Sequence, residues 1–344
     1  MGFAEFISLS MGSLPAALSL TATLAVVFVN GWTDAPNAIA SCVSTGCLDM
    51  KKAVILASVA NLVGAFTMRK IGVGVSETVI NMADFGNDPA ASLAALCAGM
   101  SAVVIWACAA WAFGIPTSES HALLAGLSGA SVAISGGFSG IDMSQLAKVF
   151  YGLVFSSVLG FVCGFVVSKL TAITFTGTER EKSERFFRAS QIVSSGIMAF
   201  MHGAQDTQKF AGVLTLEMLM LGSENAAASW IFPVCALIMS LGTALGGGRI
   251  IKTVGVDMVK MHTYQGFSAD TAGGLCLFLS TVFGFPVSTT HTKTTAVMGV
   301  GAAKSMHSVD WSVAVDMAAA WIFTFPGCGI LGWLLSCIYL RVFV

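Results

Sequence analysis

Two carboxylates stand inside apolar stretches of this sequence. Asp34 follows an apolar run over 24–29, and Asp206 follows another over 196–201. If those stretches lie in a bilayer, a bare carboxylate there costs at least about 2–3 kcal/mol. Each acid therefore needs a bound cation, a proton or a basic partner, unless it caps a helix start near the membrane surface.

The residue three positions after each acid indicates which ligand or partner that acid could have. Asn37 follows Asp34 and Lys209 follows Asp206, in each case on the same helical face. The side-chain oxygens of Asp34, Asn37 and Asp206 suit a Na+ site. Lys209 either forms an internal ion pair with Asp206 or faces a bound anion.

Two further motifs are typical of helix starts. GIPTSESH (114–121) and GFPVSTTH (284–291) each place glycine and proline before a cluster of hydroxyl side chains. Proline is favoured in the first turn of a helix, and serine or threonine at its cap. The hydroxyl residues are Thr117, Ser118 and Ser120 in the first motif and Ser288, Thr289 and Thr290 in the second. Two such termini would together bind a tetrahedral oxyanion through free N–H groups and dipole ends; the alternative is two ordinary capped helices.

Both motifs end in histidine, and the first contains an acid. His121 and His291 either have the same structural role in each half of the chain or relay protons. Glu119 would stand beside the anion site. It therefore points away, carries a proton or has a cation partner.

The motifs recur at a nearly fixed offset. When residues 30–40 are shifted by 172 positions onto 202–212, Gly31 meets Gly203 and Asp34 meets Asp206. The two helix-start motifs align after a shift of 170, with Gly, Pro, Ser and His coinciding at four of eight positions. This pattern indicates an internal duplication, with repeats over 1–176 and 190–344 joined by a segment over 177–189. An odd number of membrane crossings in each repeat gives inverted topology. Inverted repeats with broken helices are typical of secondary transporters.

The composition favours a membrane protein. Of the 344 residues, 56% are hydrophobic and 10% are charged, whereas about 25% are charged in a soluble domain. We therefore predict an all-α, polytopic transmembrane helical bundle with two inverted-topology repeats and broken helices or helical hairpins at the midplane. The net charge of -1 provides no field that would attract nucleic acid. None of the nine cysteines forms a C-x-x-C pair, so we expect buried small hydrophobes.

Basic residues predict the orientation. Segment 177–189 contains four lysines or arginines, whereas none precedes Lys51. Short loops rich in these residues stay in the cytoplasm. We expect a multi-pass protein of the cell membrane (plasma or inner) with about ten embedded segments, its N-terminus outside and segment 177–189 in the cytoplasm.

At these residues the sequence resembles a known family. NGWTDAPNAIAS (30–41) resembles the first signature of the inorganic phosphate transporter (PiT) family, and HGAQDTQKFAGV (202–213) resembles the second in its bacterial form. PTSESH and PVSTTH resemble the paired helix starts of that family. GTALGGGRIIKTVG followed by QGFSAD resembles its second-half connecting stretch. The resemblance runs from Val29 to Gly301.

The resemblance implies phosphate uptake coupled to Na+ or H+. It also implies a transport domain held by a scaffold of flanking helices, often as a dimer. Asp34, Asn37 and Asp206 fall on positions that handle cation and phosphate, and the six hydroxyl residues fall on the phosphate cradle. Asp270 stands where the family commonly has an acid, which makes it a further cation-coupling candidate.

Three positions depart from the family pattern. Gln205 stands where the second signature has Asn, Lys209 where many members have Asn, and Glu119 where a small hydroxyl residue is usual. We keep Gln205 among the cation-coupling candidates and Lys209 among the phosphate-binding ones, beside Asp34 and Asp206. The number of bound cations and the choice of anion stay open.

The sequence thus predicts a secondary active transporter that moves inorganic phosphate by Na+ or H+ symport with alternating access. A sulfate or other oxyanion permease of the same fold is the alternative. We expect no enzyme, because the chain has no H-E-x-x-H, G-x-S-x-G or nucleotide loop. The expected partners are phosphate and membrane lipids, without nucleic acid and without a cofactor beyond the coupling ion.

Overall fold

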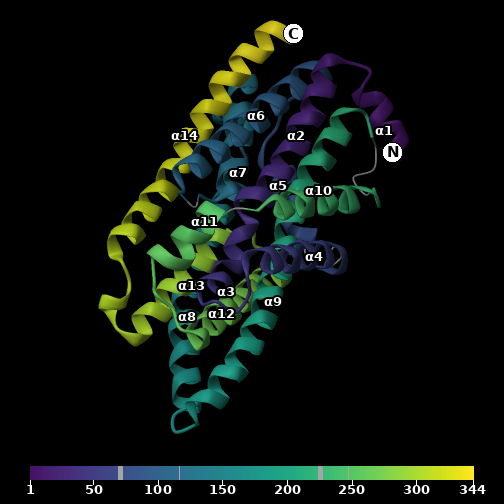
Figure 1. Ribbon diagram of the computed structural model, residues 1–344. Coiled ribbons are helices and arrows are strands. Elements are labelled where there is room, and N and C mark those ends of the chain that lie inside the picture. Colours follow the sequence, from purple (N-terminus) through teal and green to yellow (C-terminus); the bar gives the residue numbers. More distant parts are fainter. Residues whose placement is uncertain (69–72, 116, 224–227, 247) are drawn as a thin grey trace.

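The computed structural model describes residues 1–68, 73–115, 117–223, 228–246 and 248–344. Within these ranges the chain is helical, apart from turns and two isolated antiparallel bridges, Ala83 with Ile141 and Val259 with Val309. The all-α expectation is confirmed (Figure 1).

The first half of the chain is helical, with a helix break near Asp34. Its elements are α1 (Phe3–Ser10), α2 (Leu14–Thr33), a 3-10 turn (Ala35–Ile39), α3 (Ala40–Ser44), α4 (Met50–Met68), α5 (Val73–Met82), α6 (Pro89–Phe113), α7 (Glu119–Ser135), a 3-10 turn (Phe138–Gly140) and α8 (Met143–Thr174). The second half contains α9 (Arg180–Met220), α10 (Ile231–Leu245), α11 (Gly248–Lys252), a π-helical turn (Thr253–Asp257), α12 (Thr263–Val282), α13 (Thr289–Lys304), a 3-10 turn (Met306–Ser308) and α14 (Trp311–Phe343).

Several helices are long and apolar enough to cross a membrane. Among the described residues these are Leu14–Ser44, Met50–Thr67, Pro89–Phe113, Met143–Thr174 and Trp311–Phe343, with Ile231–Leu245 and Gly248–Asp257 as a bent sixth candidate. This is fewer than the ten or so embedded segments that we expected. One reason is that α7 and α13, with 17 and 16 residues, are too short to span a bilayer by themselves.

The central connection is shorter than predicted. We expected a loop over 177–189, but α9 begins at Arg180, so most of that segment is helical. An ion pair of 3.0 Å between Glu181 and Arg185, four residues apart, supports this first part of α9. Figure 1 shows α8 and α9 as a hairpin whose tip lies far from both chain termini.

Helices of each half pack closely against helices of the other half. A Cβ atom added to Gly31 of α2 would lie 2.0 Å from the carbonyl oxygen of Met239 in α10. In the same way, a Cβ atom on Gly203 of α9 would lie 2.2 Å from the carbonyl oxygen of Asn61 in α4. Gly31 and Gly203 are 172 positions apart. Each signature helix therefore packs closely on a helix from the other repeat.

A second pair of crossings repeats this arrangement. A Cβ atom on Gly129 of α7 would lie 2.0 Å from the carbonyl oxygen of Gly329 in α14, and one on Gly299 of α13 would lie 2.0 Å from that of Phe161 in α8. Gly129 and Gly299 are 170 positions apart. The same packing thus occurs twice with the partners exchanged, which is consistent with two repeats of inverted topology.

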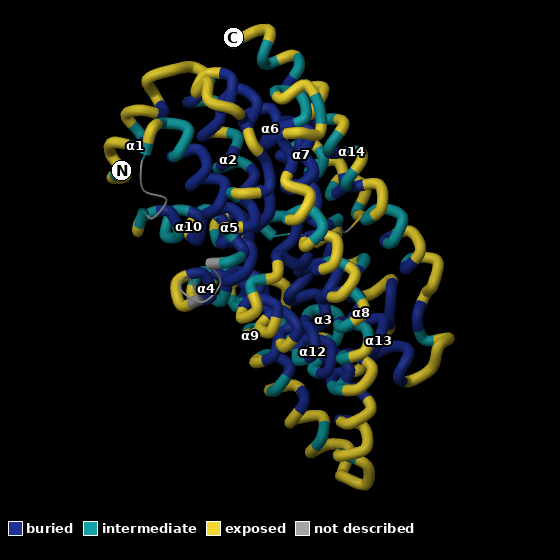
Figure 2. The backbone as a smooth tube through the Cα atoms, turned by 180° about the vertical axis from the view of Figure 1, so that it is seen from behind, coloured by how far each residue is buried: buried dark blue, intermediate teal, exposed yellow. Residues whose placement is uncertain are grey.

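Exposed apolar side chains lie on the outer helices. Figure 2 shows a buried centre and exposed residues along α8, α14 and the tip of the α8–α9 hairpin. Val154, Phe155 and Val158 of α8 are 62%, 56% and 58% exposed, and Ile322 and Phe323 of α14 are 70% and 65% exposed. Apolar patches of this kind suit a lipid environment rather than water.

Replacing Gly129 with alanine should destabilise the protein. The added methyl group would meet the backbone of Gly329, which cannot move without shifting α14, and overpacking of this kind costs about 1–3 kcal/mol or more. Thermal unfolding of the purified protein in detergent should show a lower midpoint. Gly137→Ala is the matched control, because its Cβ would have no neighbour within 4 Å and its φ of 172° is extended. Equal midpoints for the two variants would contradict the packing argument.

Candidate functional site

The two predicted helix starts are present. Ser118 caps α7 by accepting a hydrogen bond from the His121 backbone N–H at 3.3 Å, and Ser288 caps α13 through that of His291 at 3.1 Å. Pro286 lies two residues before the cap rather than in the first turn, and its counterpart Pro116 lies outside the described residues. Both helix starts therefore direct backbone N–H groups into the protein interior.

The first signature acid lies where α2 ends. Pro36 has no backbone N–H to continue the helix, and the chain turns into a 3-10 helix immediately after Asp34. The Asp34 carboxylate is buried and accepts hydrogen bonds from Asn37 Nδ2 at 2.8 Å, from Thr289 Oγ1 at 3.3 Å and from Thr290 Oγ1. Among the described residues, no lysine or arginine forms an ion pair with it.

The second signature acid lies within an unbroken helix and has a basic partner. Asp206 in α9 accepts a charge-assisted hydrogen bond from Lys209 Nζ at 2.6 Å, and His202 Nε2 lies 3.4 Å from its carboxylate. The amide of Asn30 in α2 donates to it at 3.1 Å. Of the two roles left open for Lys209, the internal ion pair is therefore the one present.

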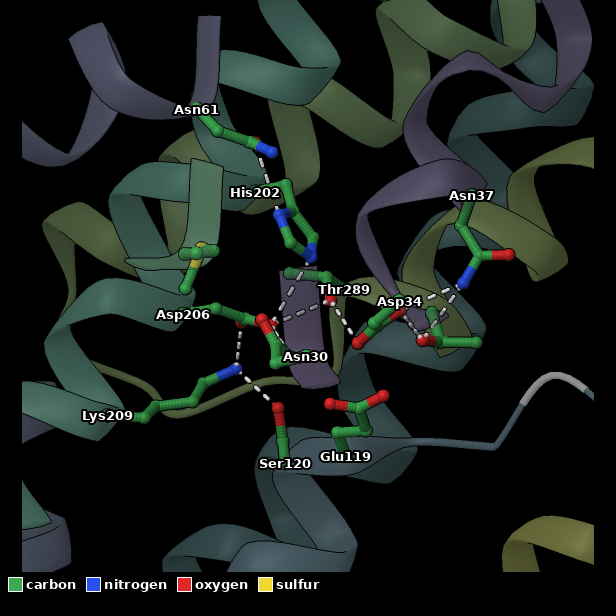
Figure 3. A network of polar contacts seen from close by, with 12 residues as sticks. Asn30, Asp34, Asn37, Asn61, Glu119, Ser120, His202, Asp206, Lys209 and Thr289 are labelled. Carbon is green, nitrogen blue, oxygen red and sulfur yellow. Dashed lines mark hydrogen bonds and ion pairs between the residues drawn. The ribbon is translucent and has the colours of Figure 1, made fainter. Parts of the chain in front are cut away.

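Lys209 also connects the two helix starts. Its ammonium donates to Ser120 Oγ of α7 at 2.5 Å and to the carbonyl oxygen of Val287, immediately before the α13 cap, at 2.8 Å. Figure 3 shows this side chain between Asp206 and Ser120. The positive charge thus lies where the hydroxyl-rich motifs from both halves meet.

Three carboxyl groups belong to this cluster, and Lys209 carries its one ammonium group among the described residues. Beside Asp34 and Asp206 lies Glu119, at the start of α7 (Figure 3). Glu119 accepts a hydrogen bond from Thr33 Oγ1, and its other oxygen is buried without a hydrogen-bond partner. All three carboxyl groups are buried. If they are ionised, their combined charge exceeds that of Lys209, so the site cannot take up an anion unless cations or protons enter as well.

Other candidates lie beside this cluster. Asp270 forms a buried ion pair with Lys293 and accepts hydrogen bonds from Ser41 and Ser195. The Gln205 amide donates to the carbonyl oxygen of Phe285 at 3.1 Å. Neither side chain forms a hydrogen bond or ion pair with Asp34 or Asp206 among the described residues.

The six predicted hydroxyl residues of the helix starts also differ in what they contact. Ser120, Thr289 and Thr290 bond to the charged side chains, whereas Ser118 and Ser288 hold the helix caps. Thr117 is half-buried and forms no side-chain hydrogen bond with the described site residues.

Sequence reasoning missed two members of the site. His202 and Asn30 both contact Asp206, and they are 172 positions apart, the same offset as the two acids. That coincidence could have identified them. Ligand atoms of Asp34, His202 and Asp206 all lie within 4.8 Å of one another, a spacing that could hold a metal cation. Asn61, which orients the His202 ring through Nδ1 at 3.2 Å, has no comparable signal in the sequence.

Replacing Asp270 with asparagine should destabilise the fold. The change would leave the Lys293 charge buried without a partner, and breaking a buried pair from one side costs about 3–5 kcal/mol. Thermal unfolding in detergent should show the loss, and the double variant Asp270→Asn, Lys293→Met should recover most of it. An Asp270→Asn protein as stable as the wild type would show that Lys293 does not depend on this partner.

Known proteins resemble this chain in both sequence and fold. The family described as the phosphate transporter family matches residues 30–332. The "Probable low-affinity inorganic phosphate transporter" of Bacillus subtilis (strain 168) is 35% identical over 318 residues, which cover 92% of this chain and 94% of that protein. A protein of the same name from Rhizobium meliloti (strain 1021) is 36% identical over 308 residues, which cover 88% and 90%.

A solved structure shares the fold. "The sodium-dependent phosphate transporter" superimposes with a TM-score of 0.84 at 20% identity, covering 95% of this chain and 99% of that chain. The family match spans both signatures and both helix starts. This chain therefore belongs to the phosphate transporter family, whose members are transporters and not enzymes.

Proposed function

We propose that this protein carries inorganic phosphate across the membrane together with a cation that binds at Asp34. The observation that carries the proposal is the charge imbalance of the site. Asp34, Glu119 and Asp206 are all buried, and of the three only Asp206 forms an ion pair with an ammonium group, that of Lys209. If the three acids are ionised, a phosphate anion adds to an excess of negative charge, so its entry has to be coupled to positive charge.

The phosphate position is the junction of the two helix starts. There the N-termini of α7 and α13 direct backbone N–H groups and dipole ends toward the Lys209 ammonium. Ser120, Thr289 and Thr290 add hydroxyl groups that donate to an anion. Lys209 would exchange its bond to Asp206 for one to phosphate.

The cation position is on the Asp34 side. Asp34 has only neutral hydrogen-bond donors, whereas Asp206 already has Lys209. The side-chain oxygens of Asn30 and Asn37 are buried without hydrogen-bond partners. Together with Asp34 and Thr290 they form an oxygen-rich set that suits Na+. A proton on Asp34 would provide the same compensation of charge.

The carboxyl groups favour phosphate over sulfate. Phosphate keeps a proton near neutral pH and can donate it in a hydrogen bond to a carboxylate, whereas sulfate has no proton to donate. Asp206, Asp34 and Glu119 are carboxyl groups at the helix starts that can accept it. Sulfate would leave these buried acceptors unsatisfied beside a second anion.

The packing of each half against the other supports alternating access. The site combines Asp34 of the first half with Thr290 of the second, and Lys209 of the second with Ser120 of the first. A rocking motion of one repeat against the other would open the site to each side in turn.

Replacing Asp34 with asparagine should abolish coupled uptake. The change removes the charge that attracts the cation and keeps the shape of the side chain. We expect proteoliposomes with wild-type protein to accumulate radiolabelled phosphate under an imposed Na+ or H+ gradient, and the variant to lose this by at least tenfold. Gly137→Ala, far from the site, is the control for reconstitution. Normal gradient-driven uptake by Asp34→Asn would refute the assignment.

Excess sulfate should not inhibit the uptake of phosphate. Unlabelled phosphate added to the same vesicles should suppress the uptake of label, whereas an equal concentration of sulfate should leave it within about twofold of the control. Strong inhibition by sulfate, with sulfate itself accumulated, would keep the site but change the substrate.

A further inference from the structure

A second buried acid lies on α9, away from the phosphate site. The Glu217 side chain is 0% exposed and forms no ion pair among the described residues. The hydroxyl groups of Ser19 and Thr23 in α2 face its carboxyl group, and both residues are also 0% exposed. None of these three side chains forms a hydrogen bond of normal geometry.

Glu217 lies on the same face of α9 as Asp206, the face that packs against α2. Eleven residues separate them, which is three turns and about 20° of rotation, so both face α2, about 16 Å apart along the helix. On α2, Asn30 bonds to Asp206, and Thr23 lies seven residues earlier. The buried, apolar Val213 of α9 lies between the two acids. The Glu217 group is therefore separate from the phosphate site but lies between the two helices that carry the signature acids.

Among the described residues, no positively charged side chain faces Glu217. The titratable group that faces it is the Cys97 thiol of α6. On α5 the side chain of Glu77 points to solvent, α10 contributes the buried Cys235 thiol, and α2 contributes the two hydroxyl groups. A buried, unpaired carboxylate ion is energetically unfavourable, whereas a protonated carboxyl group can donate a hydrogen bond to Ser19 or Thr23.

A proton fits this site better than a metal ion. The backbone of α2 and α9 is unbroken at Ser19, Thr23 and Glu217, so its carbonyl oxygens are used within the helices. One carboxyl group and two hydroxyl groups supply few oxygens, and hard cations take about six or more in protein sites.

We propose that Glu217 is a proton-binding site, separate from the phosphate site, whose proton keeps α2 and α9 packed in the form that transports phosphate. The protonated carboxyl donates to Thr23 or Ser19. When the proton leaves as the pH rises, the resulting carboxylate destabilises the seam between α2 and α9. Transport therefore falls toward alkaline pH for a reason that does not involve Asp34.

Glu217→Gln is the first test, because glutamine has the shape of the protonated acid and cannot ionise. In proteoliposomes under a fixed driving gradient, wild-type phosphate uptake should fall several-fold from mildly acidic to mildly alkaline pH, and this fall should be absent from Glu217→Gln. Glu77→Gln, an exposed acid on α5, is the matched control and should keep the wild-type profile. A Glu217→Gln profile that falls like the wild type would overturn the proposal.

A spectroscopic test does not depend on transport. Infrared spectra of the purified protein at neutral pH should contain a protonated-carboxyl band that the double variant Ser19→Ala, Thr23→Val shifts to higher frequency, since both hydroxyl partners are lost. This variant changes the side chains little in size and serves even if Glu217→Gln does not fold. A spectrum that the double variant leaves unchanged would overturn the proposal. A shifted band in a protein that takes up no phosphate would keep the proton site and reject only the proposed transport function.

Discussion

The Lys209–Asp206 ion pair is the interaction on which the centre of this protein depends. Both side chains are almost wholly buried, and the ammonium also contacts Ser120 and the backbone of Val287. Buried pairs of this kind rarely stabilise a fold more than apolar residues would. Its value lies in position: it places a positive charge where two helix N-termini meet, and it compensates one of three acids there.

The close packing between helices of the two halves brings these two helix N-termini together. Close crossings at Gly31 and Gly203 bring each signature helix against a helix of the other repeat, because any larger residue would meet backbone. The crossings at Gly129 and Gly299 do the same for the two helices that begin at the site. Neither half contains a complete site, so motion of one half against the other necessarily changes it.

The duplicated framework carries chemistry that is not duplicated. Pro36 ends α2 just after Asp34, whereas Gln208 at the equivalent position lets α9 continue past Asp206. Asn37 contributes an amide where Lys209 contributes a charge. These differences leave Asp34 with neutral hydrogen-bond donors and give Asp206 a basic partner, at positions that the repeat makes equivalent.

The sequence by itself determined the features that depend on local periodicity. Caps at Ser118 and Ser288, a carboxylate in each signature and an amphipathic spacing of three residues can all be deduced from a helical repeat. Only the tertiary structure decided that Lys209 pairs with Asp206, that Thr33 bonds to Glu119, and that Asp270 belongs to Lys293. The bond between Thr33 and Glu119, for example, joins residues 86 positions apart, so it depends on how helices cross and not on the pattern within any one of them.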